Sequence, residues 1–481
     1  MLQCTQKKGG AGLEYLSVRQ AMEKWHMTDR RVTALCREGR IPGAKKTGKT
    51  WLIPDDAEMP LDGRTRAYAQ KGSRGEGPTG EAAYTASGAG EKARQRFIEL
   101  YGKEPEGSAF TPYHLCPVGA HCDHQQGVIT GLVIDKGIHM VYGPKHNGVI
   151  ELASLQFPKR AQWHVNVTPE EKQNDWADHL RGACIALGRR YPLRVGLCAI
   201  INGELPIGGL SSSAATILTF LSALSRLNGI RLKPEELIAI AREAEGRYVE
   251  SANGSLGQVC EIYCRKDKLL KMDLLDGKRE LIEYPKTGEP FEILLFFSGL
   301  SKSLASRRYN RRVDECRAAA YALLAFAGEN RQSLRETGMR LVPRELFDRY
   351  RDRLPADWAR RAEHWYTEQA RCEEAAEAWR RGDMRRFGAL CTESGHSSVE
   401  NWQTGAPELH TLFDIVTHTA GIYGGRYAGA GFKGCVMAFA EPGKREEILQ
   451  KVETAFLAAC PELREKYSAH VCRSADGVHL E

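Results

Sequence analysis

Residues 203–224, "GELPIGGLSSSAATILTFLSAL", place glycines and a cluster of three serines directly before a long apolar run. This run predicts a buried helix that begins next to the serines. Backbone N–H groups in the first turn of a helix have no partner within the helix, so they can bind an anion, while serine hydroxyls add hydrogen bonds or bind a divalent cation. An ordinary capped helix that follows a glycine turn is the alternative.

The chain is divided into several domains, because its 481 residues are too many for one ordinary domain. The segment 61–92 is rich in Gly, Ala, Ser and Thr and has no apolar periodicity, which predicts a flexible linker. It separates a small domain at 13–60 from a large α+β body, which we divide into residues 93–300 and 301–481. Strand-like runs such as "FEILLFFSG" and long apolar helices alternate in this body.

The charge of the chain is concentrated near its start. Residues 1–54 hold eleven Lys and Arg against four Asp and Glu, whereas the rest of the chain holds 57 of each kind. The formal net charge of +7 therefore lies entirely in the N-terminal segment. A concentrated basic surface is typical of a protein that binds a polyanion. A solvated basic surface without a partner is the alternative.

The pattern of residues 13–58 predicts two short helices and a hairpin. Ser17 can cap the first helix, Val32 and Leu35 lie on one face of the second, and "IPGAKKTGKTWLIP" forms the hairpin. This stretch resembles the excisionase or MerR-type winged helix-turn-helix domains, which implies DNA binding. A protein-interaction module, or a relic that no longer binds DNA, is the alternative. The residues expected to contact DNA are Arg30, Arg31, Arg37, Lys45 and Lys46.

Three stretches of the body occur in a characteristic order: "TPYHLCPVGAHCDHQQGVITG", the glycine- and serine-rich stretch above, and "GGRYAGAGFKGCVMAFA". Together with "AEGRYVESANGSLGQ" and "SKSLASRRYNRRVDEC", they resemble the GHMP kinases, and most closely the galactokinases. The resemblance covers residues 93 to 481. It implies a two-lobed GHMP kinase fold, with an N-lobe like domain 2 of ribosomal protein S5 and a ferredoxin-like C-lobe. It also implies a galactose-like sugar and ATP as ligands, with Mg²⁺ as cofactor.

The resemblance assigns expected roles to individual residues. The expected sugar-binding residues are His121, Asp123, Gly254 and Tyr309. The expected nucleotide-binding residues are Pro206, Gly208, Gly209, Leu210, Ser211, Ser212 and Ser213. Ser213 and Glu245 are expected to hold Mg²⁺, and Gly429, Gly431 and Lys433 form the loop of the third stretch.

Other functions of these residue types remain open from the sequence. His121 could be a satisfied core histidine, and Asp123 could cap a local turn. The run "HLCPVGAHCDH" could bind a metal ion, although its spacing fits no standard zinc motif.

The body departs from the galactokinase pattern at the positions that transfer phosphate. His114 stands where galactokinases have an arginine, and Gly257 stands where they have the catalytic aspartate, so no catalytic residue is retained. Loss of a general base typically costs about 10²–10⁴-fold in rate. Glu250 is a candidate substitute acid. Further departures are Ala120 for a glutamate, His124 for a tyrosine, Lys433 for a glycine, and one residue fewer in "PIGGL".

The resulting hypothesis is a protein that binds a galactose-type sugar and ATP and transfers phosphate weakly or not at all. Its DNA-binding domain would make it a sugar-responsive regulator. An active galactokinase or related sugar 1-kinase is the alternative. Ala120 leaves the identity of the sugar open, because a hydroxyl-accepting carboxylate is missing from that position. The N-terminus lacks the apolar core of a signal peptide, and the apolar runs are shorter than a membrane span. We therefore expect a cytoplasmic protein whose fourteen cysteines are reduced thiols.

Overall fold

The computed structural model forms two compact units, Met1–Gly80 and Glu81–Glu481, which are described separately below. The described residues are 15–25, 29–37, 41, 43–48, 50–54, 57, 88–208, 210, 212–300, 305–329, 332–429, 431 and 434–478. No helix among them is long and apolar enough to cross a membrane.

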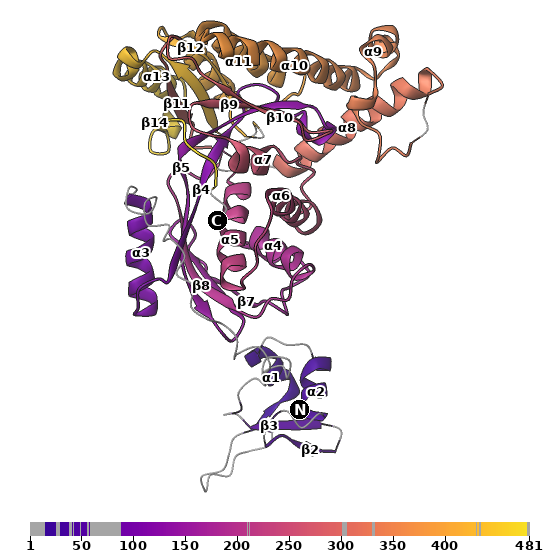
Figure 1. The fold of residues 1–481 in the computed structure, drawn as a ribbon, viewed down its shortest axis with the longest axis vertical. Helices are drawn as coiled ribbons and strands as arrows, with labels where there is room; N and C mark the ends of the chain where they lie inside the picture. The colour runs from indigo at the N-terminus through magenta and orange to yellow at the C-terminus, as the bar shows by residue number, and fades with distance from the viewer. Residues whose placement is uncertain are drawn as a thin grey trace. The chain divides into compact units, whose positions relative to one another are not determined.

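The described residues of the small unit form two helices and a three-stranded antiparallel sheet of order β1-β3-β2. Its elements are β1 (Tyr15–Ser17), α1 (Val18–Trp25), α2 (Asp29–Arg37), β2 (Lys45–Thr47) and β3 (Thr50–Pro54) (Figure 1). The predicted cap is confirmed, because Ser17 Oγ accepts the Gln20 N–H at 3.3 Å and Gln20 Oε1 accepts the Ser17 N–H at 2.9 Å. Strand β1 was not predicted from the sequence. The buried core consists of Ala21, Val32, Leu35, Cys36, Ile41 and Ile53.

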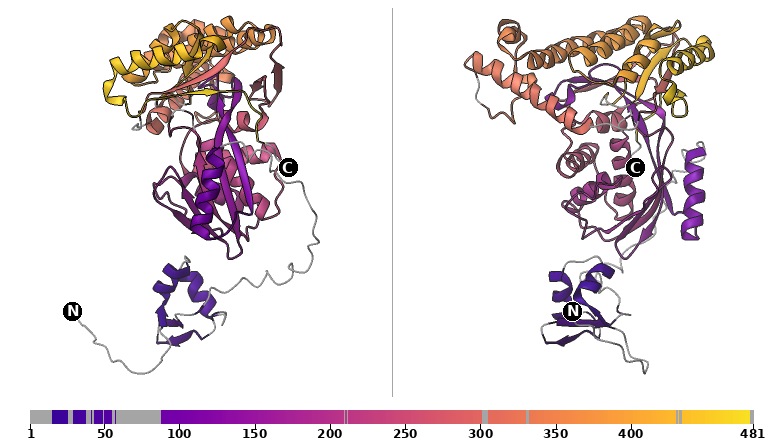
Figure 2. Two further views of the ribbon diagram at one scale, coloured as in Figure 1. Left: turned by 90° about the vertical axis from the view of Figure 1, so that its left-hand side faces the viewer. Right: turned by 180° about the vertical axis from the view of Figure 1, so that it is seen from behind.

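The N-lobe of the body is built on a mixed seven-stranded sheet. Its strands are β4 (Gly107–Leu115), β5 (Val128–Lys145), β6 (Val149–Ser154), β7 (Ala161–His164), β8 (Gly196–Gly203), β9 (Lys268–Asp273) and β10 (Arg279–Glu283). They follow the order β10-β9-β5-β8-β6-β7, and β4 pairs with the long strand β5. One face is covered by α3 (Gly88–Tyr101), and the other by α4 (Asp178–Gly188), α5 (Ser213–Leu227), α6 (Pro234–Glu243) and α7 (Leu256–Tyr263) (Figures 1 and 2).

The C-lobe sheet has the order β12-β13-β11-β14, and all its pairs are antiparallel. Its strands are β11 (Glu292–Phe297), β12 (Ile422–Tyr427), β13 (Cys435–Ala440) and β14 (Ser468–Cys472). This order, with α13 (Arg445–Ala459) between the last two strands, is that of a ferredoxin-like βαββαβ unit. The connection between β11 and β12 carries α8 (Ala305–Phe326), α9 (Arg344–Tyr350), α10 (Ala356–Arg381), α11 (Met384–Glu400) and α12 (Pro407–His418). The predicted α+β, two-lobed fold is therefore confirmed.

Two predicted boundaries of the body are wrong. Helix α3 begins at Gly88, so residues 88–92 belong to its first turns and not to the linker, and Gly90 is buried. Strand β11 pairs with β13 and β14, so residues 292–297 belong to the C-lobe although the sequence division assigned them to the N-lobe. Apolar periodicity marks a strand, but it does not reveal the sheet to which that strand belongs.

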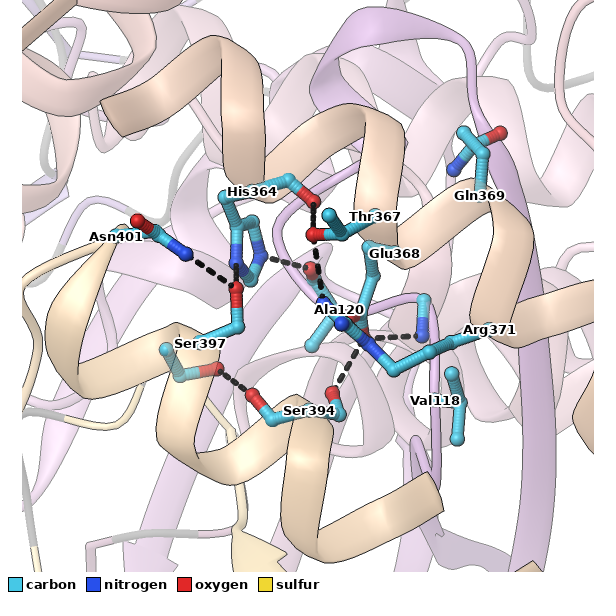
Figure 3. A network of polar contacts seen from close by, with 12 residues as sticks. Val118, Ala120, His364, Thr367, Glu368, Gln369, Arg371, Ser394, Ser397 and Asn401 are labelled. Carbon is cyan, nitrogen blue, oxygen red and sulfur yellow. Dashed lines mark hydrogen bonds and ion pairs between the residues drawn. The ribbon is translucent and has the colours of Figure 1, made fainter. Parts of the chain in front are cut away.

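A buried polar network connects helices α10 and α11 to the loop between β4 and β5 (Figure 3). The Glu368 carboxylate, which is fully buried, accepts the Gly119 N–H at 2.7 Å and the Ser394 hydroxyl. It also pairs with Arg371 at 2.7 Å and lies 3.5 Å from Arg426 Nη1. A carboxylate from a C-lobe helix thus fixes a backbone amide of the N-lobe.

His364 adds a second contact between α10 and the same loop. Its Nε2 lies 3.0 Å from the Ala120 carbonyl oxygen and its Nδ1 lies 2.9 Å from Ser397 Oγ (Figure 3). A carbonyl can only accept, so Nε2 carries the proton and Nδ1 accepts from the serine. Burial lowers the pKa of His364 to about 4, so its ring is neutral at physiological pH.

The charge of Glu368 depends on this network. Burial by itself would raise the pKa of Glu368, but the positive charges of Arg371 and Arg426 outweigh it and lower the pKa to about 2. A depressed carboxyl pKa contributes stability above the unfolded-state pKa, and this stability is lost as the pH falls towards 2.

We expect Glu368→Gln to lower the free energy of unfolding by roughly 3–5 kcal/mol, because it leaves the two arginines without their ionised partner in a buried site. Urea denaturation followed by tryptophan fluorescence measures this change. The matched control is Glu377→Gln, which removes an exposed pair with Arg380 on the same helix and should alter the free energy by less than about 1 kcal/mol. Equal stability of the two variants would contradict the assigned role of Glu368.

Candidate active site

One pocket gathers the four predicted sugar-binding residues, Glu245 and the two positions of the family's transfer residues. It has a volume of about 660 Å³, counted with the open solvent at its mouth. It is lined by His114, Cys116, Ala120, His121, Asp123, Ala214, Glu245, Asn253, Gly254, Leu256, Gly257, Gln258, Tyr309, Tyr427 and Gly429. These residues come from both lobes, because β4 and α7 belong to the N-lobe and β12 to the C-lobe.

His121 is held in an uncommon conformation beside the pocket. Its φ is 62°, in the left-handed region, and its ring stacks on Trp402 with a centroid distance of 4.8 Å and an interplanar angle of 4°. Burial lowers the pKa of His121 well below its ordinary value, so the ring is neutral. Its buried Nε2 bonds to no described residue. A buried polar atom without a partner is costly, so this nitrogen is suited to a polar ligand.

Asp123 and Gly254 lie against each other in the same pocket. Asp123 Oδ2 accepts the Leu256 N–H at 3.3 Å, and burial raises the pKa of the Asp123 carboxyl. A Cβ atom at position 254 would lie 2.4 Å from Asp123 Oδ2, so only glycine leaves room for this carboxylate. Tyr309 lines the same pocket as Asp123 and Gly254, and the centroid of its ring lies 6.1 Å from that of His121.

Ser213 and Glu245 form an oxygen-rich corner at the start of α5. Ser213 Oγ donates to Glu245 Oε1 at 2.6 Å, and Gln258 Nε2 donates to the other carboxylate oxygen at 2.7 Å. Hydroxyl and carboxylate oxygens are ligands that Mg²⁺ accepts, so these two residues fit the expected ion.

The glycine- and serine-rich loop borders a second, smaller pocket of about 230 Å³. This pocket is lined by Tyr113, Gln156, Leu205, Pro206, Ile207, Gly208, Leu210 and Ser212. Ser212 makes no side-chain cap bond, so the first amides of α5 are not capped by it. Gly208 has a φ of 110°, which side chains rarely adopt. Gly209 and Ser211 lie outside the described residues.

His114 and Gly257 occupy the two positions where the transfer residues were expected. His114 Nδ1 lies 2.8 Å from Glu261 Oε1, and both side chains are buried. Burial lowers the pKa of His114 to about 4. Burial, together with the charge of Glu245, raises the pKa of Glu261 well above its ordinary value.

Gly257 lies directly beside the imidazole of His114. A Cβ atom at position 257 would lie 2.8 Å from His114 Cε1 and 2.9 Å from Ala214 Cβ. Glu261 was not among the site residues predicted from the sequence. The signal available was an acidic residue within the apolar stretch "VCEIYC", one turn after Gly257.

Several other predicted residues lie elsewhere. Glu250 does not line the pocket; its exposed side chain pairs with Lys172, so it is not a substitute acid there. His124 does not line the pocket either, and its Nδ1 contacts Gln125. In the third stretch Gly429 lines the pocket and Gly431 has a φ of 71°, whereas Lys433 lies outside the described residues.

The metal alternative for "HLCPVGAHCDH" gains no support. Within the part of the chain that the structure describes, no three His, Cys, Asp or Glu side chains are grouped to hold a metal ion.

The residues predicted to contact DNA lie in the small unit. Arg37, Lys45 and Lys46 are exposed there, and the side chains of Arg30 and Arg31 lie outside the described residues.

Known proteins are similar to the body over most of its length. The family model for the GHMP kinase N-terminal domain matches residues 178–265, and that for the C-terminal domain matches residues 375–458. A galacturonokinase of Arabidopsis thaliana is 33% identical, covering 77% of this chain and 92% of the relative. A galactokinase of Roseiflexus sp. (strain RS-1) is 27% identical, covering 80% and 95%.

Solved structures agree on the fold. The galactokinase of Lactococcus lactis, solved with galactose, superposes with a TM-score of 0.72 at 23% identity, covering 81% of this chain and 98% of that one. A mevalonate kinase superposes with a TM-score of 0.54 at 16% identity, covering 77% and 99%. The two domain matches and the extent of the similarity to the galacturonokinase show that this chain belongs to the GHMP kinase family.

Proposed function

We propose that the body binds a galactose-configured sugar and ATP with Mg²⁺, and that it transfers phosphate to the anomeric hydroxyl only weakly. The observation that carries the proposal is the content of one pocket. Groups suited to binding, namely His121, Asp123 and Glu245, line it, whereas the positions of the family's transfer residues hold His114 and Gly257. A fully active sugar 1-kinase is the second candidate, and the 33% identity to a galacturonokinase favours it.

Three side chains account for nucleotide and ion binding in this proposal. Ser213 and Glu245 would hold Mg²⁺, which neutralises charge on a triphosphate when it is bound. The first amides of α5 and the Ser212 hydroxyl would donate to phosphate oxygens. These residues position the nucleotide.

The preferred sugar in this proposal is a galactose-configured sugar acid. Ala120 lines the pocket beside His121 at the position where galactokinases have a glutamate, so no carboxylate there repels a second one. Arg312 also adds positive charge near His121, whereas Arg426 is already paired with Glu368. The charges around His121 therefore favour a carboxylate ligand, as in a uronic acid.

The small unit supports a separate proposal of DNA binding. Its strand β2 is fully exposed and carries Lys45 and Lys46, and Arg37 is exposed at the end of α2. Helix α2 followed by the β2–β3 hairpin suits a winged helix-turn-helix domain, in which the second helix enters the major groove. A sugar-binding body joined to such a unit would act as a sugar-responsive regulator.

We expect galacturonate to bind at least about tenfold more tightly than galactose in calorimetric titrations. The reason is that the family's glutamate is missing at Ala120 and that positive charge lies near His121. A tenfold difference corresponds to about 1.4 kcal/mol. Ala120→Glu should abolish the preference, since it returns a carboxylate to the pocket wall. Ala325→Glu, on an exposed position of α8, is the control and should leave both affinities unchanged. Equal affinity of the original chain for both sugars would refute the preference.

Turnover tests the transfer proposal. In a coupled ADP-release assay the double variant Gly257→Asp with His114→Arg should exceed the original chain by about 10²-fold or more, since it restores the family's pair. Gly257→Asp alone should show no gain, because its Cβ would lie 2.8 Å from His114 Cε1. Fast turnover by the original chain on any sugar of a panel would rule out weak transfer. No gain in the double variant, with sugar binding retained, would refute the assignment of the two positions.

The full chain should bind random-sequence duplex DNA with an affinity that falls steeply as salt rises. Arg30→Glu with Arg31→Glu should weaken binding and reduce the slope of log K against log salt by roughly 0.9 for each phosphate that the protein no longer neutralises. Arg380→Glu on α10, an exposed arginine of the body, is the control. Fluorescence anisotropy measures the binding. If the double variant Arg30→Glu with Arg31→Glu binds DNA as tightly as the original chain, the result would argue against DNA binding by the small unit.

A further inference from the structure

Glu261 is a buried carboxyl group that binding of sugar, ATP or Mg²⁺ leaves unused. It is fully buried on α7, one oxygen contacts His114 Nδ1 at 2.8 Å, and the other bonds to no described residue. Burying a carboxyl with an unsatisfied oxygen destabilises the fold. Groups of this kind concentrate at functional sites, so Glu261 is a candidate for one.

Glu261 stands one helical turn from Gly257. Residues four apart lie on the same face of a helix, so the Glu261 side chain leaves α7 on the same face as position 257, one turn further along the helix. Position 257 is where the family carries its aspartate. A carboxyl one turn away cannot reach the same point in the pocket by itself. The gap between Gly257 and Glu261 is filled by the imidazole of His114, whose Cε1 lies 2.8 Å from where a Cβ at 257 would stand.

His114 is oriented so that one ring nitrogen is engaged and the other is available. Glu261 bonds to Nδ1, and no described residue bonds to Nε2. The ring lines the sugar pocket together with Gly257 and Asp123. When Nδ1–H donates to Glu261, Nε2 carries the lone pair that can accept a proton.

We propose that His114 takes the proton of the anomeric hydroxyl and that Glu261 positions it. The proposal rests on the sugar pocket proposed above. As the hydroxyl proton passes to His114 Nε2, the anomeric oxygen forms a bond to the γ-phosphorus of ATP. The bond from that phosphorus to the β–γ bridging oxygen breaks, ADP leaves with the electron pair, and the protonated ring keeps its Nδ1–H bond to Glu261 Oε1. A histidine and a glutamate from two elements thereby replace one aspartate.

The test measures ADP release with galacturonate and, separately, calorimetric affinity for galacturonate. His114→Asn should lower kcat by about 10²-fold while KM changes by less than about threefold, because asparagine fills similar space but accepts no proton. Glu261→Gln should lower kcat by about tenfold or more. In the His114→Asn background, Glu261→Gln should cause no further loss, since Glu261 acts through the imidazole. His418→Asn, on the exposed end of α12, is the matched control.

A second readout does not need turnover. The imidazole nitrogen chemical shifts of His114 should report a protonated Nδ1 in the original chain, and Glu261→Gln should shift the population away from that tautomer. A change in melting temperature without these shifts would indicate a structural role for Glu261 and overturn its assignment as a positioning residue.

The outcomes separate this proposal from the one on which it rests. ADP release by the original chain that is no faster than that of His114→Asn, with galacturonate binding retained, overturns the role of His114 and leaves the sugar pocket standing. Additive losses in the double variant overturn the coupling between the two residues. Absence of sugar binding by the original chain overturns the pocket and, with it, the role of His114.

Discussion

The buried carboxylate of Glu368 joins the two lobes at the loop that lines the pocket. Glu368, on a C-lobe helix, holds the Gly119 amide of the N-lobe, and His364 in the preceding turn of the same helix holds the Ala120 carbonyl. Burying a charge costs several kcal/mol unless it is paired, so this arrangement is stable only with Arg371 and Arg426 in place. The loop that carries His121 and Asp123 is therefore shaped by residues nearly 250 positions away.

Local signals in the sequence predicted local structure. The cap at Ser17, the helix that starts at Ser213 and the strand of β11 all follow from residue type and periodicity, and the structure has them. The family resemblance, and not periodicity, brought His121, Asp123 and Glu245 together, and the structure gathers them in one pocket. The features that were not predicted depend on contacts between residues far apart in the sequence. The role of Glu261 follows from its contact with His114, 147 residues earlier, and β11 pairs with strands more than 100 residues later.

The departures from the galactokinase pattern are mutually compatible in the fold. Gly257 removes a side chain, and the imidazole of His114 takes the vacated room and bonds to Glu261. The backbone at Ala120 remains held by His364 although the family's glutamate is missing. His114 and Glu261 therefore pack against and bond to each other, although Glu261 Oε2 bonds to no described residue.

In the proposed function, charge would let the pocket prefer a sugar acid without a change of shape. Neutral His121 has a nitrogen that bonds to no described residue, Arg312 adds positive charge near it, and the neighbouring wall at Ala120 has no carboxylate. Arg426 is already paired with Glu368, so it would contribute little to a second carboxylate. A sugar carboxylate would lose more hydration on entering than a hydroxymethyl group, so the proposed preference requires charges that are ordered before the sugar binds. The loop clamped by Glu368 supplies that order.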